Sequence, residues 1–149
     1  MSERVVADST CLIALERIEQ IEILPALFES VLIPPAVAQE FGTSLPWLKV
    51  ERLSDQVLVA VLKMMIDDGE AEAITLSQEQ KCRIILDDRQ ARRVGQDMGL
   101  RVIGTVGILI LAKQRGILST IKPVLQNLDD TGFYISEALK DEALHIAEE

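Results

Sequence analysis

The chain has 149 residues, and its 24 acidic and 15 basic side chains give a formal net charge of −9 at pH 7. With 48% hydrophobic and 26% charged residues, the composition is that of one folded globular domain, 1–149, and excludes a disordered or fibrous chain. The longest apolar run, residues 106–112, is far shorter than the roughly 20 residues of a membrane-spanning helix, and no secretory signal is visible. We therefore expect a soluble cytoplasmic protein.

Short apolar runs alternate with longer amphipathic patterns along the chain. Pro35 suits the first turn of a helix and Gly42 its end, while Ser54 and Thr105 are the expected N-caps of two further helices. In chain order, the patterns predict a strand at 4–7, a helix at 11–18, a strand at 30–33, helices at 35–41, 57–65 and 70–80, a strand at 83–86, a helix at 90–96, a strand at 100–103, a helix at 105–115 and an edge strand at 133–135. This alternation predicts a three-layer α/β/α fold, with helices flanking a four- or five-stranded, mainly parallel sheet.

The charge is distributed unevenly. Residues 129–149 hold seven acidic side chains and one lysine, so this C-terminal segment carries much of the negative charge. The acidic chain as a whole argues against a polyanionic partner, but residues 81–115 hold eight basic and three acidic side chains, which leaves a local basic patch for such a partner open. The alternatives are that the basic residues form a solvated helical face, and that the acidic segment shields a site or only confers solubility.

The scarcity of histidine and cysteine limits the chemistry. His145 is the only histidine, which argues against a histidine base or a histidine-rich zinc site. Cys11 and Cys82 lack metal-ligand spacing, lie in apolar surroundings and are expected to be buried, reduced thiols. Any catalysis therefore depends on carboxylates.

Three carboxylates follow predicted strands. Asp8 comes directly after the strand 4–7, and Asp87 and Asp88 follow the strand 83–86. If these strands are parallel neighbours, their carboxyl ends meet at one edge of the sheet, where sites of α/β proteins gather. Glu40 lies in the short helix 35–41, with apolar residues one, three and four positions away, so we expect it to point inward.

Two glutamates near the start of the helix 70–80 must point in different directions. Two helical steps turn a side chain through about 200°. Glu70 shares its face with Ala73 and Ile74 and is predicted to point inward. Glu72 falls on the side of Thr75 and Glu79 and is predicted to point to water.

Four acids, Asp8, Glu40, Glu70 and Asp88, are thus predicted to converge. Two carboxylates 4 Å apart repel each other by about 4 kcal/mol at an effective dielectric constant of about 20, so a cation must join the group. Oxygen ligands without histidine or thiolate suit Mg²⁺ or Mn²⁺. The alternative is that each acid caps a helix or pairs with a lysine.

The order of the motifs resembles the PIN-domain family, small metal-dependent ribonucleases that include VapC-type toxins. The resemblance extends over nearly the whole chain and rests on VVADSTCLIAL, IPPAVAQEF, GEAEAITLS and ILDDRQARR. The closing VIGTVGILILAKQRGIL looks like a less characterised PIN subgroup that is often encoded beside small partner proteins. The resemblance implies Asp8, Glu40 and Asp88 as acids of a Mg²⁺ or Mn²⁺ site, with Thr10 as the adjacent hydroxyl.

The chain departs from the family pattern at two motifs. Glutamate replaces the aspartate of the third motif, so Glu70 or Glu72 is the implied acid, and the usual spacing to Asp88 favours Glu70. Leu86-Asp87-Asp88 replaces a Thr-x-Asp pattern, so Asp87 replaces or assists Asp88 as a ligand.

The first hypothesis is therefore a metal-dependent endoribonuclease, the toxin of a toxin–antitoxin pair, which acts on RNA and has a small antitoxin-type protein and a second copy of the chain as partners. Its site would combine catalytic, metal-binding, supporting hydroxyl and RNA-binding residues. These are Asp8, Glu40, Glu70 and Asp88 as catalytic and metal-binding acids, Asp87 as a further ligand, Thr10 and Thr105 as supporting hydroxyls, and Arg89, Arg92 and Arg93 as phosphate contacts.

Two other classes remain. A PIN fold that binds without cleaving is the second hypothesis, and an aspartyl phosphoryl-transfer domain is the third, although the segment LRVIGTVG lacks the lysine that such a domain needs. The chain has five aromatic residues, too few to predict a base-stacking platform.

Overall fold

The structure is a computed structural model that describes residues 3–149. Its sheet has the strand order β3-β2-β1-β4-β5, and every neighbouring pair is parallel. The α/β prediction is confirmed. The strands are β1 (Arg4–Ala7), β2 (Ser30–Ile33), β3 (Leu48–Val50), β4 (Arg83–Ile85) and β5 (Val102–Ile103).

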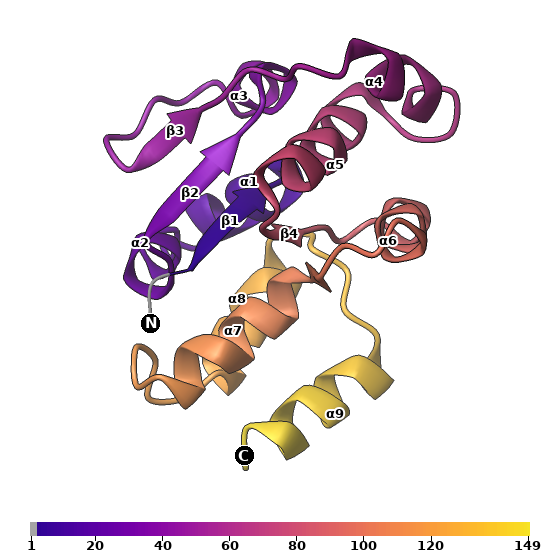
Figure 1. Cartoon of the computed structure of the whole chain (residues 1–149). Helices are drawn as coiled ribbons and strands as arrows, with labels where there is room; N and C mark the ends of the chain where they lie inside the picture. The colour runs from indigo at the N-terminus through magenta and orange to yellow at the C-terminus, as the bar shows by residue number, and fades with distance from the viewer. Residues whose placement is uncertain (1–2) are drawn as a thin grey trace.

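Helices cover both sides of the sheet. Figure 1 shows α3, α4 and α5 grouped on one side of the strands, with α7, α8 and α9 on the other. The helices are α1 (Ser9–Arg17), α2 (Ile23–Leu27), α3 (Pro35–Phe41), α4 (Gln56–Leu62), α5 (Asp68–Gln80), α6 (Arg89–Asp97), α7 (Thr105–Gln114), α8 (Lys122–Asp130) and α9 (Glu137–Ile146).

The central strands form the core because every residue after the arginine that begins each of them is apolar. Val5, Val6 and Ala7 of β1 are fully buried, as are Ile84 and Ile85 of β4. Continuous apolar runs are typical of parallel strands that helices cover on both faces. The register sets Ala7 opposite Ile85, so the residues that follow β1 and β4 emerge together at one edge.

Several elements and helix caps differ from the prediction. Residues 133–136 form an irregular segment between α8 and α9 instead of an edge strand, and β3, α2, α8 and α9 are elements that the patterns did not predict. Asp55, not Ser54, caps α4, because its carboxylate accepts the N–H of Leu58. Gly104 is the N-cap of α7, and Thr105 lies fully buried inside the first turn.

The acids of α5 connect neighbouring helices. Glu72, predicted to point to water, is half-buried and accepts the N–H of Ala36 at the start of α3. Glu79 accepts the N–H groups of Ser54 and Asp55 at the start of α4. Carboxylates stabilise helix N-termini because the first N–H groups have no partner within the helix. The face of α5 that the sequence assigns to water is therefore packed against two helices.

The acidic C-terminal segment is folded. Glu149 pairs with Lys113 of α7 and accepts the N–H groups of Ile121 and Lys122 at the start of α8, and Lys140 of α9 pairs with Asp129. Within residues 3–149, no helix combines the length and the hydropathy needed to cross a bilayer.

Candidate active site

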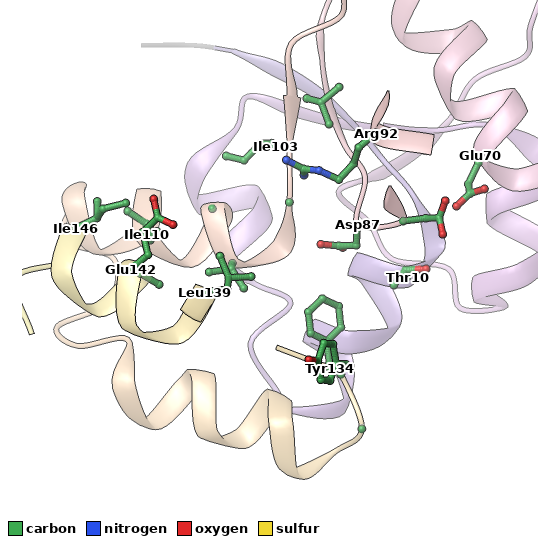
Figure 2. Close-up of a pocket in the computed structure, with 18 of the residues that line it drawn as sticks. Thr10, Glu70, Asp87, Arg92, Ile103, Ile110, Tyr134, Leu139, Glu142 and Ile146 are labelled. Atoms are coloured by element: carbon green, nitrogen blue, oxygen red, sulfur yellow. The ribbon is translucent and has the colours of Figure 1, made fainter. Parts of the chain in front are cut away.

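A cleft of about 890 Å³ lies at the carboxyl ends of β1, β4 and β5. Figure 2 shows that side chains from α1, α5, α6, α7 and α9 surround it. Acidic and hydroxyl side chains line one end, and apolar side chains of α7 and α9 line the other. The polar end includes Thr10, Asp67, Glu70, Asp87, Asp88 and Arg92, and the wall of α7 and α9 includes Ile110, Leu139 and Ile146 together with one acid, Glu142.

Asp8 lies at the junction of β1 and α1, as the sequence predicts. Only 4% of the residue is exposed, and its Oδ1 atom has no hydrogen-bond partner among the described residues. The pKa of this carboxyl is raised to about 7, chiefly by burial and also by the negative charges of Glu70, Asp67 and Glu40, while a hydrogen bond from the backbone N–H of Ser9 opposes the rise. Asp8 is therefore buried, has one carboxylate oxygen without a partner, and feels the charges of three other acids.

Glu40 reaches the same region, although the prediction that it points into the core is wrong. The residue is exposed on α3, and its Oε1 atom accepts the hydroxyl of Ser9 at 3.3 Å. A Cβ atom at Gly69 would lie 2.1 Å from that same oxygen, so the glycine leaves room for the carboxylate. Partial burial and the charge of Asp67 raise the pKa of Glu40.

Glu70 points inward, as predicted, and 7% of it is exposed. Its carboxylate accepts the N–H of Asp67, while Asp67 accepts the N–H of Glu70. This reciprocal pair is a capping box, which fixes the start of α5. Burial raises the pKa of Glu70 to about 7, with further contributions from the charges of Asp67, Asp88 and Glu40.

Asp87 and Asp88 have different surroundings. The two carboxylate oxygens of Asp87 accept the N–H of Thr105 at 2.8 Å and its hydroxyl at 2.6 Å. Burial raises the pKa of Asp87, and these hydrogen bonds oppose the rise. Asp88 is exposed at the cleft and uses only Oδ2 to cap α6, by accepting the N–H of Ala91 at 3.0 Å. Asp87 thus ties β4 to α7, whereas Asp88 faces the cleft.

The predicted phosphate contacts lie on α6. Arg92 is half-buried in the cleft and donates to the carbonyl of Leu86, and Arg89 and Arg93 are exposed in an adjoining hollow of about 800 Å³. Arg83 and Arg101, by contrast, pair with Glu3. Only part of the basic segment therefore lies beside the acids.

The site acids meet no basic partner in the described part of the chain, where the ion pairs leave out Asp8, Glu40, Glu70 and Asp88. Helix capping accounts for one oxygen each of Glu70 and Asp88. Among residues 3–149, no group of three His, Cys, Asp or Glu side chains stands close enough to hold a metal ion as placed. The structure thus gathers the acids around one edge without closing a complete ligand shell.

Two features of the site were not predicted from the sequence. Asp67 lines the cleft, and its position three residues before Glu70 matches the capping-box pattern, a signal that was available in the sequence. Phe133 and Tyr134 also line the cleft, although they are about 125 residues from Asp8 in the chain. No local pattern predicts that contact, because it depends on the path of α8.

One family model matches nearly the whole chain. The family model described as DUF3368: PIN domain matches residues 4–149. Among solved structures, the chain is similar to a PilT N-terminus domain protein from the hyperthermophilic archaeon Sulfolobus solfataricus P2, with a TM-score of 0.48 and 14% identity over 70% of this chain and 89% of that chain. No curated protein matches the chain.

Proposed function

Because the chain belongs to the DUF3368 family of PIN domains, we propose that it is a metal-dependent endoribonuclease that hydrolyses RNA phosphodiesters at the acidic end of the cleft. The observation that carries this proposal is the state of Asp8. A buried carboxylate oxygen without a hydrogen-bond partner is costly, and the negative charges of Glu70, Asp67 and Glu40 add to that cost. A divalent cation would relieve both the missing contact and the repulsion.

The donors fit such a cation. Mg²⁺ and Mn²⁺ prefer oxygen ligands, and Mg²⁺ is commonly bound through one or two carboxylates, several waters and a substrate phosphate, so an incomplete protein shell suits it. Asp8, Glu40, Glu70 and Asp88 would hold the ion, and Gly69 leaves the space in which Glu40 lies. When bound, the ion supplies an acidified water and positive charge for the phosphodiester oxygens.

The remaining residues position these acids and the substrate. Thr105 holds Asp87, and through it the turn that presents Asp88. Arg92 is fixed by the carbonyl of Leu86, which places its charge in the cleft for a phosphate. Thr10 lies exposed in the same cleft and offers a hydroxyl donor. We assign Asp88 to the metal and Asp87, with Thr105, to support.

The proposed division between the two aspartates gives a direct prediction. Asp88→Asn keeps a good helix N-cap, so we expect normal thermal stability but at least about tenfold weaker Mn²⁺ binding. Asp87→Asn loses an acceptor for Thr105, so we expect a loss of about 1–3 kcal/mol in the free energy of unfolding. Calorimetric Mn²⁺ titration and thermal melts separate the two effects. The reverse pattern would assign the metal to Asp87.

The proposed activity is tested with purified protein and labelled RNA in Mn²⁺, Mg²⁺ or EDTA. We expect cleavage only with the divalent ions. Glu70→Gln preserves the capping box while removing the charge, so it should lower cleavage at least about 100-fold without lowering the melting temperature. Glu16→Gln changes an exposed acid of α1 outside the cleft and serves as the matched control. Cleavage that persists in EDTA would reject the proposal, as would full activity of Glu70→Gln.

The finer proposal, a toxin that pairs with a small antitoxin and forms a homodimer, has narrower support. The toxin assignment rests on the resemblance of residues 102–118 to the PIN subgroup. Val57, Val61 and Met64 are exposed at helical spacing along and just beyond α4, which favours a protein partner such as a second copy.

A further inference from the structure

The cleft continues into a smaller hollow on each side. It shares Asp87, Asp88 and Arg92 with the hollow along α6, which Arg89 and Arg93 also line. The other hollow, of about 300 Å³, shares Thr10, Gly132 and Phe133 with the cleft, and Arg17 lines it. The three hollows therefore adjoin one another across the acidic site, and exposed arginines line the two outer ones; we refer to them together as the groove.

Tyr134 stands at the rim of this groove and is 83% exposed. Its neighbours are anchored: the N–H of Phe133 donates to the carbonyl of Leu128 at 3.0 Å, and Ile135 is buried. Figure 2 shows Tyr134 on the side of the cleft where Thr10 lies. The aromatic ring of Tyr134 is thus exposed to solvent at the cleft that the acids line, and the residues before and after it in the chain are anchored.

We propose that this groove binds a single-stranded nucleic acid, with one unpaired base stacked on Tyr134 and flanking phosphates on Arg17 at one end and on the α6 arginines at the other. The inference rests on the proposed function, because the acids between the two basic ends are where the phosphodiester would lie. Stacking needs an exposed ring and an unpaired base, and the arginines supply the charge that tracks a phosphate backbone.

The exposed ring of Tyr134 favours a single strand over a duplex. Bases in a duplex are already stacked on one another, so a side chain at the rim of a groove cannot reach their faces. The acids in the middle also repel phosphates, and we expect single-strand binding to strengthen when a divalent cation is present. Tyr134 would then contribute stacking, and Arg17 a sequence-independent phosphate contact.

The test measures fluorescence anisotropy of labelled single-stranded RNA and DNA and of a duplex, in Ca²⁺, with a gel confirming that each strand stays intact. Stacking on one aromatic ring is worth about 1–3 kcal/mol per base, so Tyr134→Ala should weaken binding of the single strands about tenfold. Tyr134→Phe keeps the ring face and should bind within about twofold of the parent. Gln78→Ala, at an exposed residue of α5 that lies outside the groove, is the control.

Two further readouts separate stacking from a structural effect. A 2-aminopurine scan along the strand should show quenching at one position that Tyr134→Ala removes. Arg17→Gln should lower the slope of log Kd against log salt concentration by about 0.7, the value for one phosphate contact on a single strand. Tyr134→Ala should melt at the parent temperature, because its side chain packs against little.

The inference is overturned if Tyr134→Ala binds the single strands as tightly as the parent, or if the duplex binds equally well. These measurements do not use cleavage. If quenching depends on Tyr134 but Mn²⁺ supports no RNA cleavage, the nuclease proposal fails while the binding groove stands. If Mn²⁺-dependent cleavage occurs and Tyr134→Ala leaves binding and quenching unchanged, the nuclease proposal stands while the proposed stacking on Tyr134 fails.

Discussion

Asp8→Asn is expected to reduce Mn²⁺-dependent RNA cleavage at least about 100-fold while making the metal-free protein more stable at pH 8. The first effect follows from removing the buried, unpaired carboxylate that we assign to the metal. The second follows from the pKa of Asp8, which burial raises from 3.8 to about 7. A carboxyl that resists ionisation in the folded state opposes folding wherever the unfolded chain is ionised.

The difference between the pKa values of Asp8 in the folded and unfolded states determines how stability changes with pH. Below about pH 3, well under its ordinary pKa of 3.8, the Asp8 carboxyl is largely neutral in both states and the raised pKa has little effect on stability. As the pH rises toward 7, the metal-free parent loses stability that Asp8→Asn retains, and the loss is complete above the folded pKa. The difference in free energy of unfolding at pH 8 is then as much as about 4 kcal/mol.

Urea unfolding at pH 3 and pH 8, in EDTA and in Mn²⁺, checks both parts. Mn²⁺ should stabilise the parent at pH 8 and leave Asp8→Asn unchanged, because only the parent binds the ion. Glu16→Gln, on an exposed part of α1, should follow the parent throughout. Equal stability of Asp8→Asn and the parent at pH 8 would contradict the assigned burial and repulsion.

Gly69→Ala is expected to impair the site without weakening the fold. The new Cβ atom would lie 2.1 Å from Oε1 of Glu40 and 3.1 Å from its Cδ. These atoms end a flexible side chain, so Glu40 should swing away. Gly69 lies in the first turn of α5, where alanine favours the helix by as much as about 1 kcal/mol. We expect an unchanged or higher melting temperature, with Mn²⁺ affinity and cleavage lowered about 10- to 100-fold.

A double-mutant cycle tests the cause of this loss. Glu40→Gln alone should lower Mn²⁺ affinity, and adding Gly69→Ala to it should lower the affinity little further, because the displaced carboxylate is already gone. Calorimetric titration of the four proteins gives the coupling. Additive losses would show that Gly69→Ala acts through α5 and not through Glu40.

The sequence was sufficient wherever one local rule decided the outcome. Asp8, Asp87 and Asp88 follow apolar strands, and parallel pairing of β1 with β4 brings those strand ends to one edge. The inward direction of Glu70 follows from helical periodicity and is confirmed by its burial. In these cases the signal is contained in a few consecutive residues.

The sequence was insufficient where the outcome depended on a neighbouring element. Glu72 has a polar helix face in the sequence, yet α3 lies against that face and takes its carboxylate as a cap. Thr105 looks like an N-cap but donates its hydroxyl to Asp87 instead. Tyr134 reaches the cleft only because α8 returns the chain to it. Periodicity carries no information about which element packs against a face.

The carboxylates of α5 also determine how a broad mutational survey of this domain would look. Glu70 would respond in assays of activity, whereas Glu72 and Glu79 would respond in assays of abundance or protease resistance, because they fasten α3 and α4 to the rest of the molecule. Equivalent substitutions of glutamates in one helix would thus have different effects. At Glu70 they would give a folded but inactive protein, and at Glu72 or Glu79 a less stable one.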